Sequence, residues 1–130
     1  MTHTTRRGAL KAAAAAFAAP FVWRLHAGAA PSETVLHASF GAGGMAGADI
    51  DSLSANKNLK LVAVAEVDAN QKKLAELKKR WPELRVYSDY RQLFDKEKDL
   101  NSVNVSTPDH MHAPIAMTAM QRNLHVYGQK

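Results

Sequence analysis

The feature that most constrains the fold of this chain is a glycine-rich turn after a short apolar segment. Val35 to Phe40 has the composition of a buried strand, and Gly41-Ala42-Gly43-Gly44-Met45-Ala46 follows it in the pattern G-x-G-x-x-A. A helical pattern then runs through Ile50 and Leu53. In such a unit, the first glycine makes the turn tight, the second admits a pyrophosphate to the main chain, and the small sixth residue lets helix and strand pack closely. Taken alone, these six residues also fit an ordinary tight turn.

A second apolar segment supplies an acid at the spacing that dinucleotide binding needs. The segment LKLVAVAEVD at residues 59–68 predicts a buried strand, and Glu66 lies near its end. Dinucleotide folds place an acid about 20 residues beyond the turn, where it accepts hydrogen bonds from the adenosine ribose. A carboxylate there repels a 2′-phosphate, which favours NAD over NADP. Asp68 is the alternative ribose ligand, although it also suits the start of the next helix.

Strands and helices continue to alternate along the chain. Residues 68–81 have helical spacing, with Asp68 or Asn70 expected to cap the helix N-terminus, and further strands are expected near residues 84–87, 102–105 and 124–129. The helix before the last strand is rich in Ala and Met, and its methionines (Met111, Met117 and Met120) are expected to pack inward. This alternation predicts an α/β fold with a doubly wound parallel sheet of about five strands and a ligand at the carboxyl ends of the strands.

The stretch Asp109-His110-Met111-His112 is the one cluster that suggests a metal. Three ligands within four residues on one helical turn are awkward, and no second cluster completes a site, so no metal is expected. His112 also suits a structural role near the helix start. His37 and His125 lie within expected strands and are predicted to be packing residues.

The first 30 residues have the plan of an export signal. An arginine pair, Arg6-Arg7, precedes an alanine-rich apolar segment from Ala12 to Trp23 and a small-residue end. The apolar segment is shorter than the roughly 20 residues that span a bilayer. The sequence TRRGALK resembles the bacterial twin-arginine signal, with Ala9 in place of the usual Phe. We therefore expect residues 1–30 to direct the protein to the periplasm or outside the cell; an alanine-rich packing or anchoring helix is the alternative.

The charge distribution argues against nucleic-acid binding. Of the net charge of +5, four charges arise before residue 30, where four of the 17 Lys and Arg residues lie without any acid. The remaining 13 basic residues face 12 Asp and Glu, so the rest of the chain is nearly neutral. The chain has no cysteine, which excludes disulfides and thiol catalysis.

Four motifs together resemble the Gfo/Idh/MocA oxidoreductases. GAGGMA, VAVAEVD, VNVSTPDHMHAPIAMTAM and LHVYGQK follow one another in that family's order and spacing. The resemblance covers residues 34–130 and implies an NAD(P)-binding Rossmann domain at 33–130. Family members also carry a second α/β domain with most substrate-reading residues, and they commonly form homo-oligomers. We therefore expect this chain to be the N-terminal part of a longer enzyme.

The resemblance also implies roles for individual residues. The turn, with Gly41, Gly43 and Ala46, would line the pyrophosphate, and Glu66 would bind the adenosine ribose. Further along, the resemblance implies a set of residues beside the cofactor, namely Ser106, Thr107, Pro108, Asp109 (often Asn in the family), His112 and Gln129 (usually Glu). Lys130 matches the family's lysine beside the nicotinamide and the substrate hydroxyl, which makes it the expected catalytic residue.

Three functions are compatible with these residues. The first is an exported NAD(P)-dependent oxidoreductase that acts on a sugar, cyclitol or related polyol. The second is an NAD-dependent glycoside hydrolase of the same superfamily, and the third is a nucleotide-binding module without turnover. The sequence does not discriminate among them.

Overall fold

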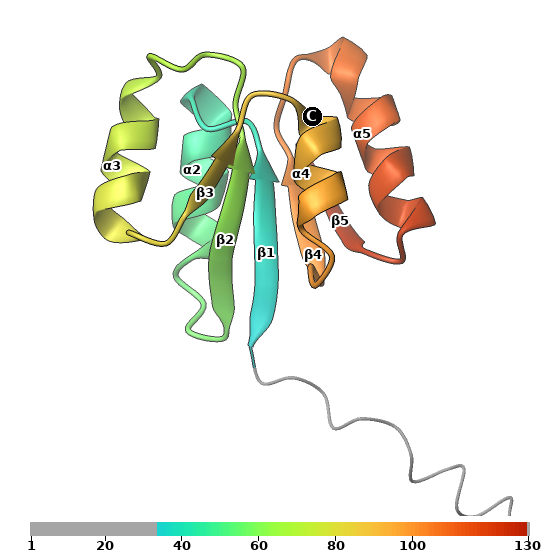
Figure 1. Cartoon of the computed structure of the whole chain (residues 1–130), viewed down its shortest axis with the longest axis horizontal. Helices are drawn as coiled ribbons and strands as arrows, with labels where there is room; N and C mark the ends of the chain where they lie inside the picture. Colours follow the sequence, from blue (N-terminus) through green and yellow to red (C-terminus); the bar gives the residue numbers. More distant parts are fainter. Residues whose placement is uncertain (1–33, 130) are drawn as a thin grey trace, which may run out of the picture. The chain divides into compact units, whose positions relative to one another are not determined.

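The computed structural model describes residues 34–129, which form a five-stranded parallel sheet with four helices. The signal segment and Lys130 lie outside the described residues. The element order is β1 (Val35–Phe40), α2 (Gly44–Leu53), β2 (Leu59–Ala65), α3 (Lys72–Arg80), β3 (Arg85–Tyr87), α4 (Tyr90–Lys96), β4 (Ser102–Val105), α5 (Asp109–Gln121) and β5 (His125–Gly128). The strands lie in the order β3-β2-β1-β4-β5 (Figure 1). The predicted doubly wound α/β fold is confirmed.

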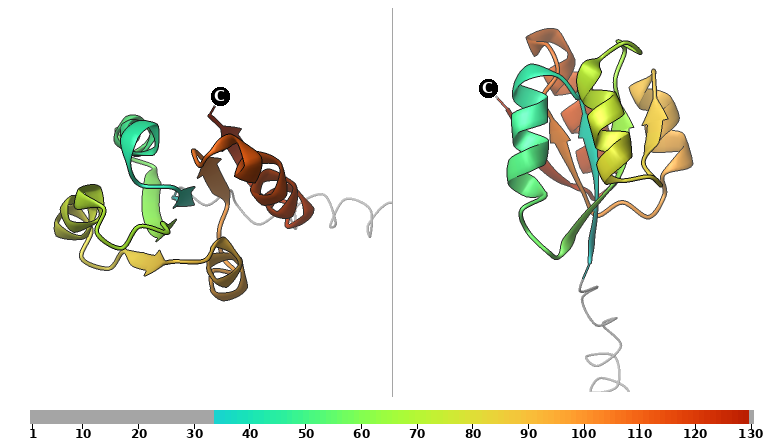
Figure 2. Two further views of the ribbon diagram at one scale, coloured as in Figure 1. Left: turned by 90° about the horizontal axis from the view of Figure 1, so that it is seen from above. Right: turned by 90° about the vertical axis from the view of Figure 1, so that its left-hand side faces the viewer.

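Two helices cover each face of the sheet. Seen from above, α2 and α3 lie on one side, and α4 and α5 lie on the other (Figure 2). The α4/α5 side holds the larger apolar core, in which the rings of Phe40 and Phe94 are 4.8 Å apart. The α2/α3 side holds a second core around Ile50, Leu61 and Leu77. Both cores form because the central strands are buried on both faces, as expected for a parallel sheet.

The layer between α2 and the paired strands β1 and β4 is polar. His37, Ser39 and Asn104 project into it, and each is at most 2% exposed. The His37 ring contacts the Ser102 hydroxyl through Nδ1 at 2.8 Å and the Asn104 amide oxygen through Nε2 at 3.0 Å. The amide oxygen only accepts hydrogen bonds, so the Nε2–H tautomer of neutral His37 satisfies both contacts.

The buried histidine predicts a stability loss in mild acid. Burial lowers the pKa of His37 below its ordinary value of 6.5. The unfolded chain therefore binds a proton at a pH where the folded chain does not, and stability falls as the pH drops below 6.5 towards the folded pKa. We expect the free energy of unfolding to decrease by up to about 1.4 kcal/mol per pH unit in that window, measured by urea unfolding at stepped pH.

The matched variants are His37→Gln and His125→Gln. His37→Gln should remove this part of the pH dependence, whereas His125→Gln should keep it because His125 lies exposed on β5. A wild-type slope that survives in His37→Gln would assign the effect to other groups.

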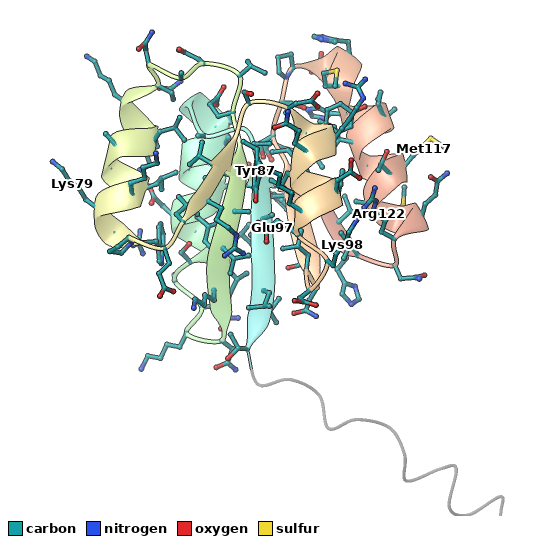
Figure 3. All side chains as sticks on the ribbon, viewed as in Figure 1. Lys79, Tyr87, Glu97, Lys98, Met117 and Arg122 are labelled. Carbon is teal, nitrogen blue, oxygen red and sulfur yellow. The ribbon has the colours of Figure 1, made fainter. Side chains whose placement is uncertain are left out.

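Several expectations about packing were wrong. His125 is exposed, and so are Met117 and Met120, which are each 56% exposed on the outer face of α5; the Met117 side chain points outward in Figure 3. Helix α3 begins at Lys72 without a side-chain cap, while the Asp68 carboxylate accepts a hydrogen bond from the Asn70 N–H in the preceding loop. In each case the local sequence suggested a packing or capping contact that the folded chain does not make.

The edge strand β3 is attached to the end of α4 through Glu97. Its carboxylate accepts hydrogen bonds from Arg85 Nε (2.5 Å), Arg85 Nη2 (2.6 Å) and the Tyr87 hydroxyl (2.6 Å), and its side chain is only 9% exposed. Figure 3 shows Tyr87 and Glu97 side by side. This attachment fixes the short strand from which the chain enters the loop at residues 88–89. Within residues 34–129, no helix is both long enough and apolar enough to cross a membrane.

Candidate functional site

The carboxyl ends of four neighbouring strands meet at one edge of the sheet. The residue after each of these strands donates its backbone N–H to a neighbouring strand in the sheet, where the carbonyl oxygen of the last residue accepts it. Glu66 bonds to Tyr87, Gly41 to Ala65, Ser106 to Phe40 and Gln129 to Val105, at 2.8 to 3.0 Å. This regular pattern brings the glycine turn, the acid and the loop after β4 to the same edge. It explains why motifs far apart in the sequence form one site.

A cleft of about 720 Å³ opens at this edge. Its volume lies within the range of about 300–1,000 Å³ that is common for ligand sites. The lining residues come from the ends of β1 to β4, the residue before α3, the start of α4 and the N-terminal half of α5: Phe40, Gly41, Ala42, Gly43, Ala65, Glu66, Val67, Gln71, Ser88, Asp89, Tyr90, Arg91, Ser106, Thr107, Pro108, His110, Met111 and Ile115.

Gly41 has a backbone and surroundings that no other residue suits. Its φ is +99°, a conformation that residues with a Cβ rarely adopt. A Cβ at this position would lie 2.7 Å from the Ser106 carbonyl oxygen and 3.1 Å from the Ala46 Cβ. The turn therefore packs against both the β4 loop and α2, as expected for a first glycine and a small sixth residue.

The N-terminus of α2 has donors available to an anion. Gly43 is the N-cap, no side chain caps the helix, and its first turn contains no acid. Free N–H groups and the positive end of the helix dipole attract phosphates. The residues present therefore fit a pyrophosphate at this point.

Glu66 connects the end of β2 to the glycine turn. Its Oε2 accepts a hydrogen bond from the Ala42 N–H at 2.8 Å, and its Oε1 accepts one from the Asp68 N–H at 3.1 Å. The side chain is half-buried and lines the cleft, whereas Asp68 is exposed and does not line it. Of the two predicted ribose ligands, Glu66 is the one that the fold places at the cleft.

Gln71, which the sequence did not suggest, lies over the glycine turn. A Cβ on Gly43 would meet the Gln71 Nε2 at 2.2 Å, so the amide occupies the space that the missing side chain leaves. Gln71 immediately precedes α3, and its side chain reaches the glycine turn. No spacing rule could have found this contact, because it joins two loops that meet only in the folded chain.

The loop after β4 contributes Ser106, Thr107 and Pro108 to the cleft. The Ser106 hydroxyl donates to the Asp49 carboxylate at 2.7 Å and accepts from the Asn104 amide at 3.0 Å. The Thr107 hydroxyl oxygen is buried without a hydrogen-bond partner among the described residues. Buried hydroxyls usually have a partner, so this oxygen fits a site built to receive a ligand group.

His112 contacts this loop and not the cleft. One of its ring nitrogens, Nε2, lies 2.5 Å from the Thr107 carbonyl oxygen. The residue thus sits one turn into α5 and holds the loop from behind. In this geometry His112 does not line the cleft, and it can act on a cofactor there only through the loop that it contacts.

The remaining predicted residues lie near the cleft without lining it. Gly44 and Met45 are exposed on the first turn of α2, and Ala46 is buried beneath the turn. Asp109 is exposed at the start of α5, and Gln129 follows β5, where its side chain accepts a hydrogen bond from the Tyr127 hydroxyl at 3.3 Å. Lys130 lies outside the described residues, so its catalytic role stays a prediction.

The segment from Ser88 to Arg91 also lines the cleft, although no motif in the sequence indicated it. The Arg91 guanidinium lies over the Tyr90 ring at 4.6 Å and 3.6 Å from the Asp89 carboxylate. The arrangement of the strands could have indicated this segment, since β3 runs parallel to β2 and ends at the same edge of the sheet. His110, Met111 and Ile115 of α5 also line the cleft. Among residues 34–129, no group of three or more His, Asp or Glu side chains is arranged to hold a metal.

Comparison with known proteins identifies the family. The model of the Gfo/Idh/MocA family, described as an oxidoreductase family with an NAD-binding Rossmann fold, matches residues 37–130. The chain belongs to the Gfo/Idh/MocA family. The matched model is that of an NAD-binding Rossmann domain, and the residues that form the cleft described above lie within the matched range.

Proteins similar to this Gfo/Idh/MocA chain include a levoglucosan dehydrogenase and a myo-inositol 2-dehydrogenase. A levoglucosan dehydrogenase of Pseudarthrobacter phenanthrenivorans is 33% identical over 63 residues, which are 48% of this chain and 16% of that protein. The fold matches myo-inositol 2-dehydrogenase of Lactobacillus plantarum (24% identity, TM-score 0.65, 75% of this chain and 28% of that one). It also matches GenD2 of gentamicin A biosynthesis in complex with NAD (25% identity, TM-score 0.65, 79% and 28%). The chain thus spans less than a third of the length of these proteins.

Proposed function

We propose that this chain is the cofactor-binding part of an NAD-dependent oxidoreductase that transfers hydride between the nicotinamide ring and a sugar, cyclitol or related polyol. The observation that carries the proposal is a cleft lined by the glycine turn, Glu66 and the β4 loop, next to the N-terminus of α2, which no side chain caps. The similarity to a levoglucosan dehydrogenase and a myo-inositol 2-dehydrogenase supports the substrate class.

The two halves of the cleft suit the two halves of the dinucleotide. The glycine turn and the N–H groups at the start of α2 hold the pyrophosphate, and Glu66 accepts hydrogen bonds from the adenosine ribose. The strand order reverses between β1 and β4, so the β4 loop with Thr107 lies on the nicotinamide side. We assign NAD over NADP because the Glu66 carboxylate repels a 2′-phosphate.

The bound cofactor supplies the hydride acceptor or donor. The protein's own contribution is to orient the cofactor and to manage the proton of the substrate hydroxyl. Lys130 is the proposed residue for the second task, because an ammonium group can hydrogen-bond a hydroxyl whose proton leaves during oxidation. We also propose that residues outside this chain, in a longer protein, recognise the substrate.

The proposal is tested by binding and product analysis. NADH fluorescence should rise on titration with the purified chain, and NADPH should bind more weakly. In the longer protein, NAD-dependent oxidation of a sugar or cyclitol supports the oxidoreductase assignment. Release of an alcohol from a glycoside without net NAD reduction would instead assign the glycosidase activity, and absence of NADH binding would refute the cofactor assignment.

We also propose export through the twin-arginine route. A folded protein can leave the cytoplasm with its dinucleotide already bound. An enzyme exported in this way does not have to find NAD outside the cytoplasm. Replacing both arginines of the pair, Arg6→Lys with Arg7→Lys, should abolish export of the protein. Cell fractionation checks this, and unchanged export of the double variant would contradict the proposed route.

A further inference from the structure

We infer that Asp49 is a positioning residue, which holds the β4 loop where it receives the nicotinamide half of the cofactor. This inference rests on the proposed function. Asp49 lies in the middle of α2, outside the cleft, and is only 9% exposed. None of the sequence motifs singled it out.

Asp49 holds Ser106 through a charge-assisted hydrogen bond. The Ser106 hydroxyl has a single proton, which it donates to Asp49 Oδ2 at 2.7 Å. Asn104 donates to the same hydroxyl at 3.0 Å, and the Asn104 amide oxygen in turn contacts the buried His37 ring at 3.0 Å. The serine side chain is therefore held from two sides, and it is directed at the helix and not at the ligand.

This arrangement is unusual at the centre of a parallel sheet. Strands of this type normally bury apolar side chains on both faces, because helices cover both. Here the layer beneath α2 contains His37, Ser39, Asn104 and a buried carboxylate. A buried charge is costly unless it is hydrogen-bonded, and a satisfied polar network fixes one arrangement of the groups that make it. Ser106 joins Asn104 to Asp49 in this network, so the β4 loop is the segment that the network orders.

The ordered loop presents a free hydroxyl. The Ser106 N–H bonds to the Phe40 carbonyl at 3.0 Å, and the Thr107 carbonyl is in contact with His112. With these backbone groups occupied, the Thr107 hydroxyl is left without a partner among residues 34–129. Asp49 and His112 thus hold the loop from opposite sides of the sheet, and Thr107 is available to a ligand.

The geometry predicts that Asp49 affects one half of the cofactor selectively. ADP carries only the adenosine and phosphate groups, which the glycine turn and Glu66 serve. NADH also carries the nicotinamide half, which the β4 loop serves. Asp49→Ala should therefore weaken NADH binding about tenfold, the scale of one lost charge-assisted hydrogen bond, and leave ADP binding within about twofold of wild type.

The experiment compares wild type, Asp49→Ala, Asp49→Asn and Ser106→Ala by titration with NADH and ADP. Asp49→Asn keeps an acceptor oxygen for Ser106 and should retain most of the NADH affinity. Ser106→Ala removes the shared hydroxyl and should reproduce the selective loss if Asp49→Ala does not fold. Equal losses for NADH and ADP, no loss of either, or no rescue by Asn would overturn the inference.

Amide hydrogen exchange separates this inference from the proposed function. Asp49→Ala should speed exchange at the Ser106 N–H more than at the Gly41 N–H, which bonds to Ala65 on the other side of β1. Wild type that binds neither ligand would refute the proposed function, and with it the cofactor role of Asp49. Unchanged Ser106 exchange in Asp49→Ala would refute the positioning step itself, whatever the ligands do.

Discussion

Gly41→Ala should destabilise the domain by about 2–6 kcal/mol and abolish measurable NADH binding. Two costs add at this position. The φ of +99° is strained for alanine, at about 1–3 kcal/mol, and the new Cβ would lie 2.7 Å from the Ser106 carbonyl oxygen. Backbone atoms cannot move aside as a flexible side chain can, so the overpacking costs about 1–3 kcal/mol more. Urea unfolding followed by circular dichroism measures the loss.

Gly44→Ala is the matched control for this variant. Gly44 also has a positive φ, +52°, but a Cβ there would meet nothing within 4 Å. We expect a cost of about 1 kcal/mol, mostly from the left-handed backbone. If Gly41→Ala were no less stable than Gly44→Ala, the close packing of the turn against the β4 loop would be wrong.

Glu66→Ser should weaken NADH binding by roughly 10- to 100-fold and reduce the preference for NADH over NADPH. The variant removes the proposed hydrogen bonds to the adenosine ribose and the charge that would repel a 2′-phosphate. It also removes the acceptor for the Ala42 N–H, 2.8 Å from Glu66 Oε2. Competition titrations with both cofactors measure the change in selectivity.

Glu66→Gln separates the charge from the contact with the turn. Glutamine keeps an oxygen for the Ala42 N–H but has no negative charge, so it should relax selectivity while retaining the turn. Asp68→Asn should change neither affinity, because Asp68 is exposed and its carboxylate accepts from Asn70. Unchanged selectivity in Glu66→Ser together with a change in Asp68→Asn would move the ribose ligand to Asp68.

The sequence was a good guide wherever a backbone constraint determined the residue type. The glycine turn, the buried strands and the acid after β2 follow from local chemistry, and the fold contains each of them where the pattern placed it. The strand predicted at residues 102–105 is β4, Ser102–Val105. Such features can be predicted because only a few residue types satisfy the required φ, burial or charge.

Contacts between distant loops were not readable in the same way. Gln71 meets Gly43, and Asp49 meets Ser106, only because the sheet brings their elements together. Met117 and Met120 have helical spacing suited to a core, yet α5 turns them outward. Side-chain direction on a helix depends on which neighbour it packs against, and the spacing of apolar residues did not contain that information.

The central claim is that a nicotinamide dinucleotide binds at the edge where the glycine turn and the β4 loop meet. It is tested most directly by following backbone amide NMR signals during titration with NADH. We expect shifts at Ala42, Gly43 and Thr107, with none at Lys57 or Asn123, which lie in the loops before β2 and β5 at the opposite end of the sheet. Shifts confined to that opposite end, or no shifts at saturating NADH, would contradict it.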